Sequence, residues 1–167
     1  MGMNLASFKL ALDLKSRGIF DSVKDIIDMG TADMRINYNN LKFLFDQSKI
    51  KFNNKKFIFL KQFPKGKRRS TKLFWNEIGI KNYYCLDINN KNNSFHIDLN
   101  YPLNKKIINK KFNLVTDFGN NEHVFNVGEA YKTMYDLTSL NGLIWIRQSV
   151  YNGNGFFNYD QSFFEGL

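Results

Sequence analysis

Residues 23–30 read Val-Lys-Asp-Ile-Ile-Asp-Met-Gly, a short run with an apolar centre that ends in an acid and a glycine. Such a run is typical of a buried strand in a parallel sheet, where both faces are covered and the side chains need not alternate. The closing glycine gives the backbone the freedom to turn sharply. Residues 23–30 are therefore expected to form the first strand of an α/β fold.

Four later segments have a similar character and are expected to be strands. They span residues 83–88, 95–99, 112–118 and 143–150. Between and before them, apolar residues recur at helical spacing. This spacing predicts helices at residues 5–15, 39–47, 70–78 and 124–140. Strands that alternate with helices predict a mostly parallel sheet with right-handed crossovers and flanking helices.

Length and composition indicate one globular domain over residues 1–167, with 43% hydrophobic residues. No apolar stretch approaches the roughly 18 residues that a membrane-spanning helix needs, so no membrane segment is expected. Cys85 is the single cysteine, which excludes an internal disulfide, and no cluster of Cys and His indicates a metal site. The expected compartment is a reducing cytoplasm.

The net charge of +9 comes from one segment, because ten Lys or Arg and no Asp or Glu lie between Gln47 and Asn76. Removing those ten from the 24 basic residues leaves 14 against 15 acidic residues elsewhere. We expect a basic insertion at about residues 48–73, a loop or loose hairpin around Pro64 and Gly66. Interleaved phenylalanines would suit stacking on nucleic acid, a less favoured reading than a solvated insertion or an anionic-substrate surface.

Four of the five expected strands end at or near an acid. These acids are Asp28, Asp87, Asp98 and Asp117. In parallel sheets ligands bind at the carboxyl ends of the strands. A carboxylate can accept hydrogen bonds from a ribose diol or an adenine amino group, and it can balance a cation. A phosphate-rich cofactor needs glycines and a helix N-terminus, so the acids favour a cationic nucleoside without phosphate.

The order of these motifs resembles that of class I (Rossmann-like) S-adenosylmethionine-dependent methyltransferases over about residues 23–150. Six stretches carry the resemblance: the acid and glycine turn at 26–32, Asp87, the Asp98-Leu99 pair, residues 112–117, Glu122-His123-Val124, and the turn at 140–143.

The resemblance implies the strand order 3-2-1-4-5, counted along the chain, and S-adenosylmethionine as cofactor. It implies cofactor contacts from Asp28, Gly30, Thr31, Asp87, Ile88, Asp98, Leu99 and Asp117, with Asp87 on the ribose and Asp98 near the adenine. His123 and Asp117 become the candidate catalytic residues, although His123 could equally cap the following helix. The implied reaction moves a methyl group to an O or N of a small molecule or glycan, chiefly by positioning.

Three features depart from the family. Ala32 and Met34 stand where later glycines are usual, and 59 positions separate Asp28 from Asp87 instead of about 20. Only five of seven family strands are found, so an incomplete domain that lacks the last two strands is expected. A non-catalytic interaction module and an RNA-modifying methyltransferase that uses the basic segment stay open as alternatives. A nicotinamide-dependent oxidoreductase is disfavoured, because G-x-G-x-x-G is missing around Gly30.

Overall fold

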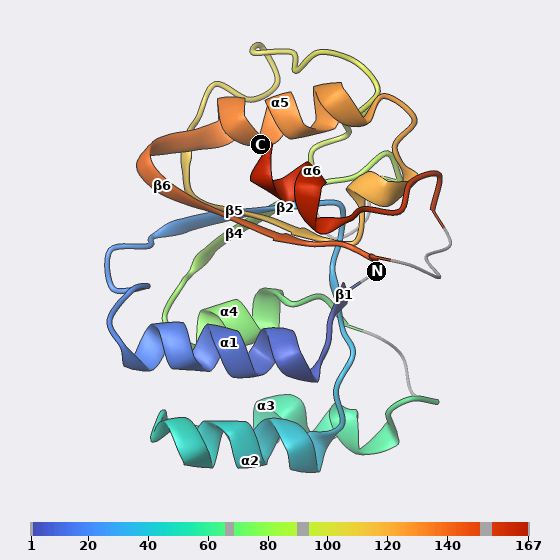
Figure 1. Cartoon of the computed structure of the whole chain (residues 1–167). Helices are drawn as coiled ribbons and strands as arrows, with labels where there is room; N and C mark the ends of the chain where they lie inside the picture. Colours follow the sequence, from blue (N-terminus) through green and yellow to red (C-terminus); the bar gives the residue numbers. More distant parts are fainter. Residues whose placement is uncertain (1, 66–68, 90–93, 151–154, 167) are drawn as a thin grey trace. The chain divides into compact units, whose positions relative to one another are not determined.

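The computed structural model describes residues 2–65, 69–89, 94–150 and 155–166 (Figure 1). The chain forms two compact units. The first comprises the residues up to 25 together with 32–83, and the second comprises 26–31 together with the residues from 84 onward. The chain therefore passes from one unit to the other three times.

Two helices of similar length belong to the first unit: α1 (Leu5–Ser16) and α2 (Tyr38–Ser48). Asn4 and Asn37 cap them, and each side chain accepts a hydrogen bond from the backbone N–H three residues further on. Such caps satisfy backbone donors that have no partner within the helix. The helices predicted at residues 5–15 and 39–47 are confirmed.

Two strands of two residues each, β1 (Gly2–Met3) and β3 (Asp33–Met34), pair in parallel in the first unit. Neither was predicted, because two residues are too few to show an alternating pattern. β3 follows the turn at Gly30 almost at once, and α2 begins only later, at Tyr38.

Part of the basic segment is helical where a loop or loose hairpin was expected; Pro64 lies in a turn, and Gly66 is outside the described residues. It contains α3 (Asn54–Phe57) and the 3₁₀-helix η1 (Ile58–Gln62). Phe57 is 0% exposed, and its ring centroid lies 5.2 Å from that of Phe52 and 6.4 Å from that of Phe45. These contacts anchor the segment to α2 through Phe45, because each buried aromatic side chain removes a large apolar area from water.

The helix predicted at residues 70–78 is present as α4 (Lys72–Glu77). Phe74 and Trp75 on this helix are fully buried. The Phe74 ring lies 4.7 Å from Phe8, edge to face, and Trp75 lies 6.1 Å from Phe20. These aromatic contacts form the centre of the first unit's core.

The main sheet has the order β4-β2-β5-β6, and most of its residues belong to the second unit (Figure 1). Its strands are β2 (Asp25–Met29), β4 (Asn82–Leu86), β5 (Phe112–Phe118) and β6 (Thr138–Arg147). β5 pairs in parallel with both β2 and β6. The expected α/β fold with a mostly parallel sheet is confirmed.

The strand predicted at residues 95–99 does not form as a strand. Phe95 alone pairs, in an isolated parallel bridge with Leu86 at the end of β4. Three residues later the Asp98 carboxylate accepts a hydrogen bond from the Asn100 N–H at 2.9 Å. This local bond competes with strand pairing and turns the chain, so among the described residues the sheet has four strands.

The helix predicted at residues 124–140 is shorter, α5 (Val127–Leu137), and the 3₁₀-helix η2 (Asn121–His123) precedes it. Asn126 caps its start, and the chain turns directly into β6 at Thr138, which has extended backbone angles. The turn expected at residues 140–143, between this helix and a strand at 143–150, does not separate them. Asn141, with a φ of 60°, instead lies within β6, whose pairing with β5 is irregular there.

In the second unit α5 lies across one face of the sheet (Figure 1). The core beneath it joins residues of β2, β4 and β5, of the loops between β4 and β5 and before α5, and of α5 itself. Its buried residues are Ile27, Met29, Leu86, Ile97, Leu99, Ile108, Phe112, Val115, Val124, Ala130, Met134 and Leu137. The last helix, α6 (Gln161–Glu165), contacts α5 through the rings of Phe163 and Tyr131, 5.2 Å apart. In the described part of the chain, no helix has the length and apolar character needed to span a bilayer.

We expect Phe57→Ala to lower the free energy of unfolding by ~3–5 kcal/mol, the usual cost of removing a buried phenylalanine ring. Phe43→Ala is the matched control, because Phe43 on α2 is 60% exposed, and its loss should be ~0.5 kcal/mol or less. Urea unfolding of both variants measures the difference. Equal losses would contradict the packed state of the basic segment.

Candidate functional site

The carboxyl ends of β2 and β4 meet in the second unit. Gly30 and Thr31 follow β2, and Asp87 follows β4. The Thr31 N–H donates a hydrogen bond to the Asp87 carboxylate at 3.4 Å. Residues 56 positions apart are thus joined at the edge where ligands bind in parallel sheets.

Asp87 is half-buried and accepts two backbone hydrogen bonds, from Thr31 and from the Asn89 N–H at 2.8 Å. Burial acts to raise the pKa of the Asp87 carboxyl, but the hydrogen bonds from Asn89 and Thr31 outweigh it and hold the pKa below its ordinary value. The group is therefore a carboxylate at neutral pH. A carboxylate offers about four acceptor positions, and the side chains of Thr31 and Asn89 act on this one together with their backbone N–H groups. Ile88 beside it is exposed.

The turn at Gly30 strongly favours glycine. Gly30 has a φ of 85°, and a Cβ atom at this position would lie 2.5 Å from Oδ1 of Asn120. Asn120 belongs to the loop after β5, so the side chain of that loop rests directly against the turn. Beyond the turn Ala32 is buried and the chain enters β3, where a helix would follow in a phosphate-binding turn.

Asp28 is placed within the sheet rather than at its open edge. It is buried on β2, opposite Thr116 of β5, and the Thr116 hydroxyl donates a hydrogen bond to its carboxylate. The structure thus gives Asp28 a partner inside the protein, and this acid supports strand pairing.

Asp98 and Leu99 point to different surroundings. Asp98 is exposed and holds the turn with Asn100 through its carboxylate. Leu99 is buried in the core of the second unit. Of this pair, only Asp98 is accessible to a ligand.

Asp117 lies at the end of β5 and is fully buried. Its carboxylate accepts hydrogen bonds from the backbone N–H groups of Asn120 at 2.7 Å and Asn121 at 3.3 Å, and from the side-chain amide of Gln148. Burial raises the pKa of the Asp117 carboxyl to about 7; the two backbone bonds act against this rise, while the charges of Asp28 and Glu122 add to it.

The Glu122-His123 pair is formed within η2. Nε2 of His123 lies 3.4 Å from a carboxylate oxygen of Glu122, and the histidine is exposed whereas the glutamate is buried. The alternative role of His123 as a helix cap is wrong, because the side chain of Asn126 caps α5. An exposed imidazole beside a carboxylate has the arrangement of a general base.

Sequence analysis missed two residues of this edge, Asn120 and Gln148. Asn120 covers Gly30, and Gln148 binds Asp117. Asparagine is frequent throughout the chain, so nothing in the pattern distinguished Asn120. Gln148 lies within the predicted strand at residues 143–150, and nothing in that pattern indicates a buried hydrogen-bond partner.

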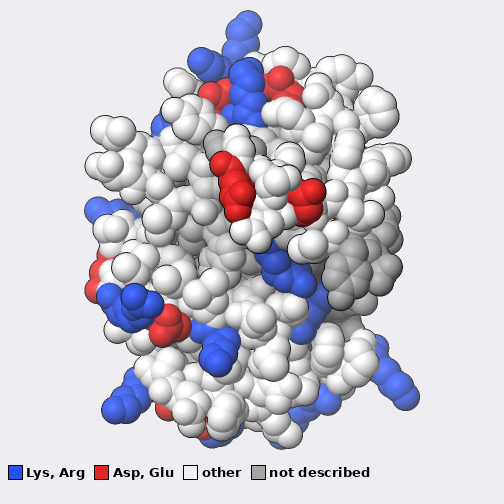
Figure 2. All heavy atoms as spheres, in the orientation of Figure 1, with Lys and Arg blue, Asp and Glu red and all other residues white. Residues whose placement is uncertain are grey.

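Two phenylalanines of the basic segment, Phe52 and Phe59, are engaged in contacts within the first unit. Phe52 packs against Phe45 at 4.9 Å, and Arg69 lies 5.0 Å from the ring centre of Phe59. On the face shown in Figure 2, Lys and Arg are interspersed with Asp and Glu rather than gathered in one patch. Among the described residues, no group of three or more His, Cys, Asp or Glu side chains is placed to hold a metal ion.

No protein-family model matches the chain, and neither a curated protein sequence nor a solved structure shows significant similarity to it.

Gly30→Ala should destabilise the protein by at least ~1–2 kcal/mol, the cost of a left-handed backbone for a residue with a Cβ, because the new atom also meets Asn120. Gly128→Ala is the control: no atom lies within 4 Å of its Cβ position on α5, and alanine should add up to ~1 kcal/mol there. Thermal and urea unfolding check both. A neutral Gly30→Ala would contradict the described turn.

Asp117→Asn should stabilise the protein increasingly as pH rises from about 4 to about 7. The pKa of Asp117 is raised on folding, so the wild type has its full stability only below the unfolded pKa and loses it as pH rises through the folded pKa of about 7. The difference should reach on the order of 4 kcal/mol. Urea unfolding at several pH values measures it.

The asparagine of this variant can be accommodated, because Oε1 of Gln148 is buried without a hydrogen-bond partner among the described residues. A flip of the Gln148 amide would present that oxygen to the new NH₂ group. Asp46→Asn is the control, because Asp46 is exposed on α2; its effect on the free energy of unfolding shows what the same substitution does at the surface. A pH-independent difference for Asp117→Asn would refute the raised pKa.

Proposed function

We propose that this chain is a class I S-adenosylmethionine-dependent methyltransferase domain that transfers a methyl group to an O or N of a small molecule or glycan. The observation that carries the proposal is the ionised Asp87 carboxylate beside the Gly30-Thr31 turn. A carboxylate at this edge of the sheet can accept paired hydrogen bonds from the two hydroxyls of a ribose.

The turn favours a nucleoside without phosphates over a dinucleotide. A pyrophosphate is bound by the N–H groups at the start of a helix that directly follows the turn. Here residues after Gly30 lead into β3, and α2 starts only at Tyr38. Asp87 and the accessible Asp98 supply negative charge at this edge, which suits the cationic cofactor.

We place the expected third strand at the outer side of β4, where Phe95 forms its bridge with Leu86. With residues 95–99 in that position, the order 3-2-1-4-5 follows from the observed order β4-β2-β5-β6. The Rossmann-like order belongs to this proposal and rests on that single bridge.

Asp87 would hold the ribose, Thr31 and Gly30 would line the turn, and Asp98 would lie toward the adenine. The cofactor, when bound, supplies an electrophilic methyl group on a sulfonium. The protein's part is to position the acceptor, exclude water and receive a proton. His123 would accept that proton, since its Nε2 lies beside Glu122 and its ring is exposed.

Asp117 is a positioning residue in this proposal. It is fully buried, and its oxygens face backbone N–H groups of the loop after β5. It therefore holds that loop, and Asn120 within it, against Gly30. A non-catalytic module with this fold is the second candidate, favoured by the Asn120 side chain that already occupies the space over Gly30.

We expect S-adenosylmethionine and S-adenosylhomocysteine to raise the melting temperature of the chain and NAD to leave it unchanged, since a ligand of the native state stabilises it by mass action. Asp87→Ala should weaken cofactor binding by ~1.5–3 kcal/mol for each hydrogen bond to the charged group. Isothermal titration measures this loss.

Asp46→Ala is the matched control, because Asp46 is an exposed acid of the first unit that pairs with Lys42. It should bind the cofactor as the wild type does. A thermal shift with NAD alone would overturn the proposal. A folded chain with no shift for either sulfur compound would favour the non-catalytic module.

A further inference from the structure

The end of α2 and the start of the basic segment enclose a hollow within the first unit. Its volume is about 470 Å³, which lies in the usual range of small-molecule sites. Its described lining residues all belong to the first unit. The polar ones are Lys42, Asp46, Lys49, Lys51 and Asn54. The proposed methyl transfer uses none of these residues, so the hollow needs an account of its own.

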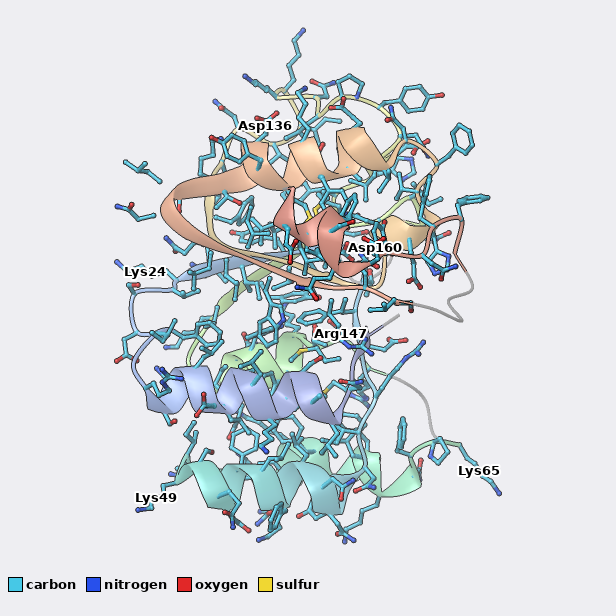
Figure 3. The ribbon with its side chains drawn as sticks, viewed as in Figure 1. Lys24, Lys49, Lys65, Asp136, Arg147 and Asp160 are labelled. Carbon is cyan, nitrogen blue, oxygen red and sulfur yellow. The ribbon has the colours of Figure 1, made fainter. Side chains whose placement is uncertain are left out.

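The turn after α2 fixes the wall of the hollow. Lys49, labelled in Figure 3, ends α2 with a left-handed φ of 58°, and its N–H donates to carbonyls of the last helical turn. The Ile50 N–H donates to the Phe45 carbonyl at 3.3 Å, so the chain reverses in a typical helix cap. Phe52 then packs on Phe45, with ring centroids 4.9 Å apart. The backbone that carries Lys49 and Lys51 is therefore held in place.

Two lysines of the hollow have no acidic partner. Asp46 is the one acid among the described lining residues, and its carboxylate pairs with Lys42 at 2.6 Å. Lys49 and Lys51 are exposed, and neither forms an ion pair with an acid in the described part of the chain. Three lysines against one acid leave this lining with a net positive charge. A concave surface of one sign of charge attracts ligands of the opposite sign, so the hollow favours an anion.

Structural roles account for other lysines of the basic segment but not for this pair. Lys56 of α3 forms an ion pair with Glu77 at 2.8 Å. The negative end of the α2 dipole attracts a cation within or next to the last helical turn, which accounts for Lys49. Lys51 lies beyond that turn. A second unpaired lysine on the same hollow therefore favours a ligand that both lysines bind.

Asn54 adds a neutral hydrogen-bond donor to the hollow. Its side-chain oxygen accepts a hydrogen bond from the Tyr38 hydroxyl at 2.8 Å, which leaves its NH₂ group as the donor for a ligand. Phosphate oxygens accept charge-assisted hydrogen bonds from lysine, and they also accept hydrogen bonds from side-chain amides. Two ammonium groups and one amide therefore match a ligand that carries more than one phosphate.

We propose that this hollow binds the phosphate groups of a small polyphosphate compound, with Lys49, Lys51 and Asn54 as the donors. The proposal is independent of the proposed methyl transfer. A nucleic acid needs a positively charged groove along its backbone and rings on which its bases stack. Figure 2 instead shows Lys and Arg interspersed with Asp and Glu on the visible face. The Phe52 ring is stacked on Phe57, 5.2 Å away. A compact anion therefore fits this hollow better than RNA does.

The test is isothermal titration of the full chain with inorganic tripolyphosphate, and with a single-stranded oligouridylate as the nucleic-acid probe. We expect tripolyphosphate to bind, and the double variant Lys49→Gln/Lys51→Gln to lose about tenfold or more in affinity for it. Lys105→Gln/Lys106→Gln is the matched control, because it removes the same charge from two exposed lysines of the second unit. The control should bind tripolyphosphate as the wild type does.

Urea unfolding shows whether each variant folds. Lys51→Gln alone keeps the left-handed residue at position 49 and decides the outcome if the double variant does not fold; it should lose about threefold or more in affinity. The proposal is overturned when tripolyphosphate does not bind at concentrations on the order of 1 mM. It is also overturned when both double variants lose affinity equally, when the folded Lys49 and Lys51 variants bind as tightly as the wild type, or when only the oligouridylate binds.

Discussion

The parallel pairing of β2 with β5 is the constraint on which the second unit depends. Ile26, Ile27 and Asp28 stand opposite Leu114, Val115 and Thr116. A slip by one residue would turn every side chain to the other face and would separate the buried Asp28 carboxylate from the Thr116 hydroxyl. The register that avoids this brings Gly30 and the loop after β5 together, so the contact between Asn120 and Gly30 follows from strand pairing.

In the sequence the four strand-end acids look equivalent, but in the structure they differ in burial. All three of Asp28, Asp87 and Asp117 accept hydrogen bonds from the protein, but Asp87 is only half-buried whereas Asp28 and Asp117 are buried. Asp98 uses its carboxylate for a local turn. A pattern can locate an acid at the end of a strand, but its burial is decided by the loop that later covers it. That loop comes from distant sequence, which is why the roles of these acids could not be predicted.

The same reasoning explains which elements of the fold were predictable. β5 was expected at residues 112–118 and is found there, since a long apolar run leaves little choice. The helices of the basic segment were not predicted, because lysines stand between the phenylalanines and obscure the apolar pattern of the buried face. Phe57 lies on that face. The strand expected at residues 95–99 does not form, because Asp98 makes a local turn with Asn100. The spacing of apolar residues indicates which face of a regular helix or strand is buried. It gives wrong bounds where side-chain hydrogen bonds end that element early.

The buried carboxylate of Asp117 connects the sheet to the surface loops. A charge without water is costly unless several donors face it, and its donors come from two loops, Asn120 and Asn121 after β5 and Gln148 after β6. Both loops follow neighbouring strands, β5 and β6, at the carboxyl edge of the sheet. The acid therefore weakens the core at neutral pH while it fixes the loops at the carboxyl edge. A packed apolar residue at position 117 would serve stability better, but it would offer no acceptor to the loop N–H groups and would leave Asn120 free to move from Gly30. A buried acid that lowers stability but orders the loops beside the Gly30 turn is the pattern expected where a protein departs from the rules of stable packing for the sake of function.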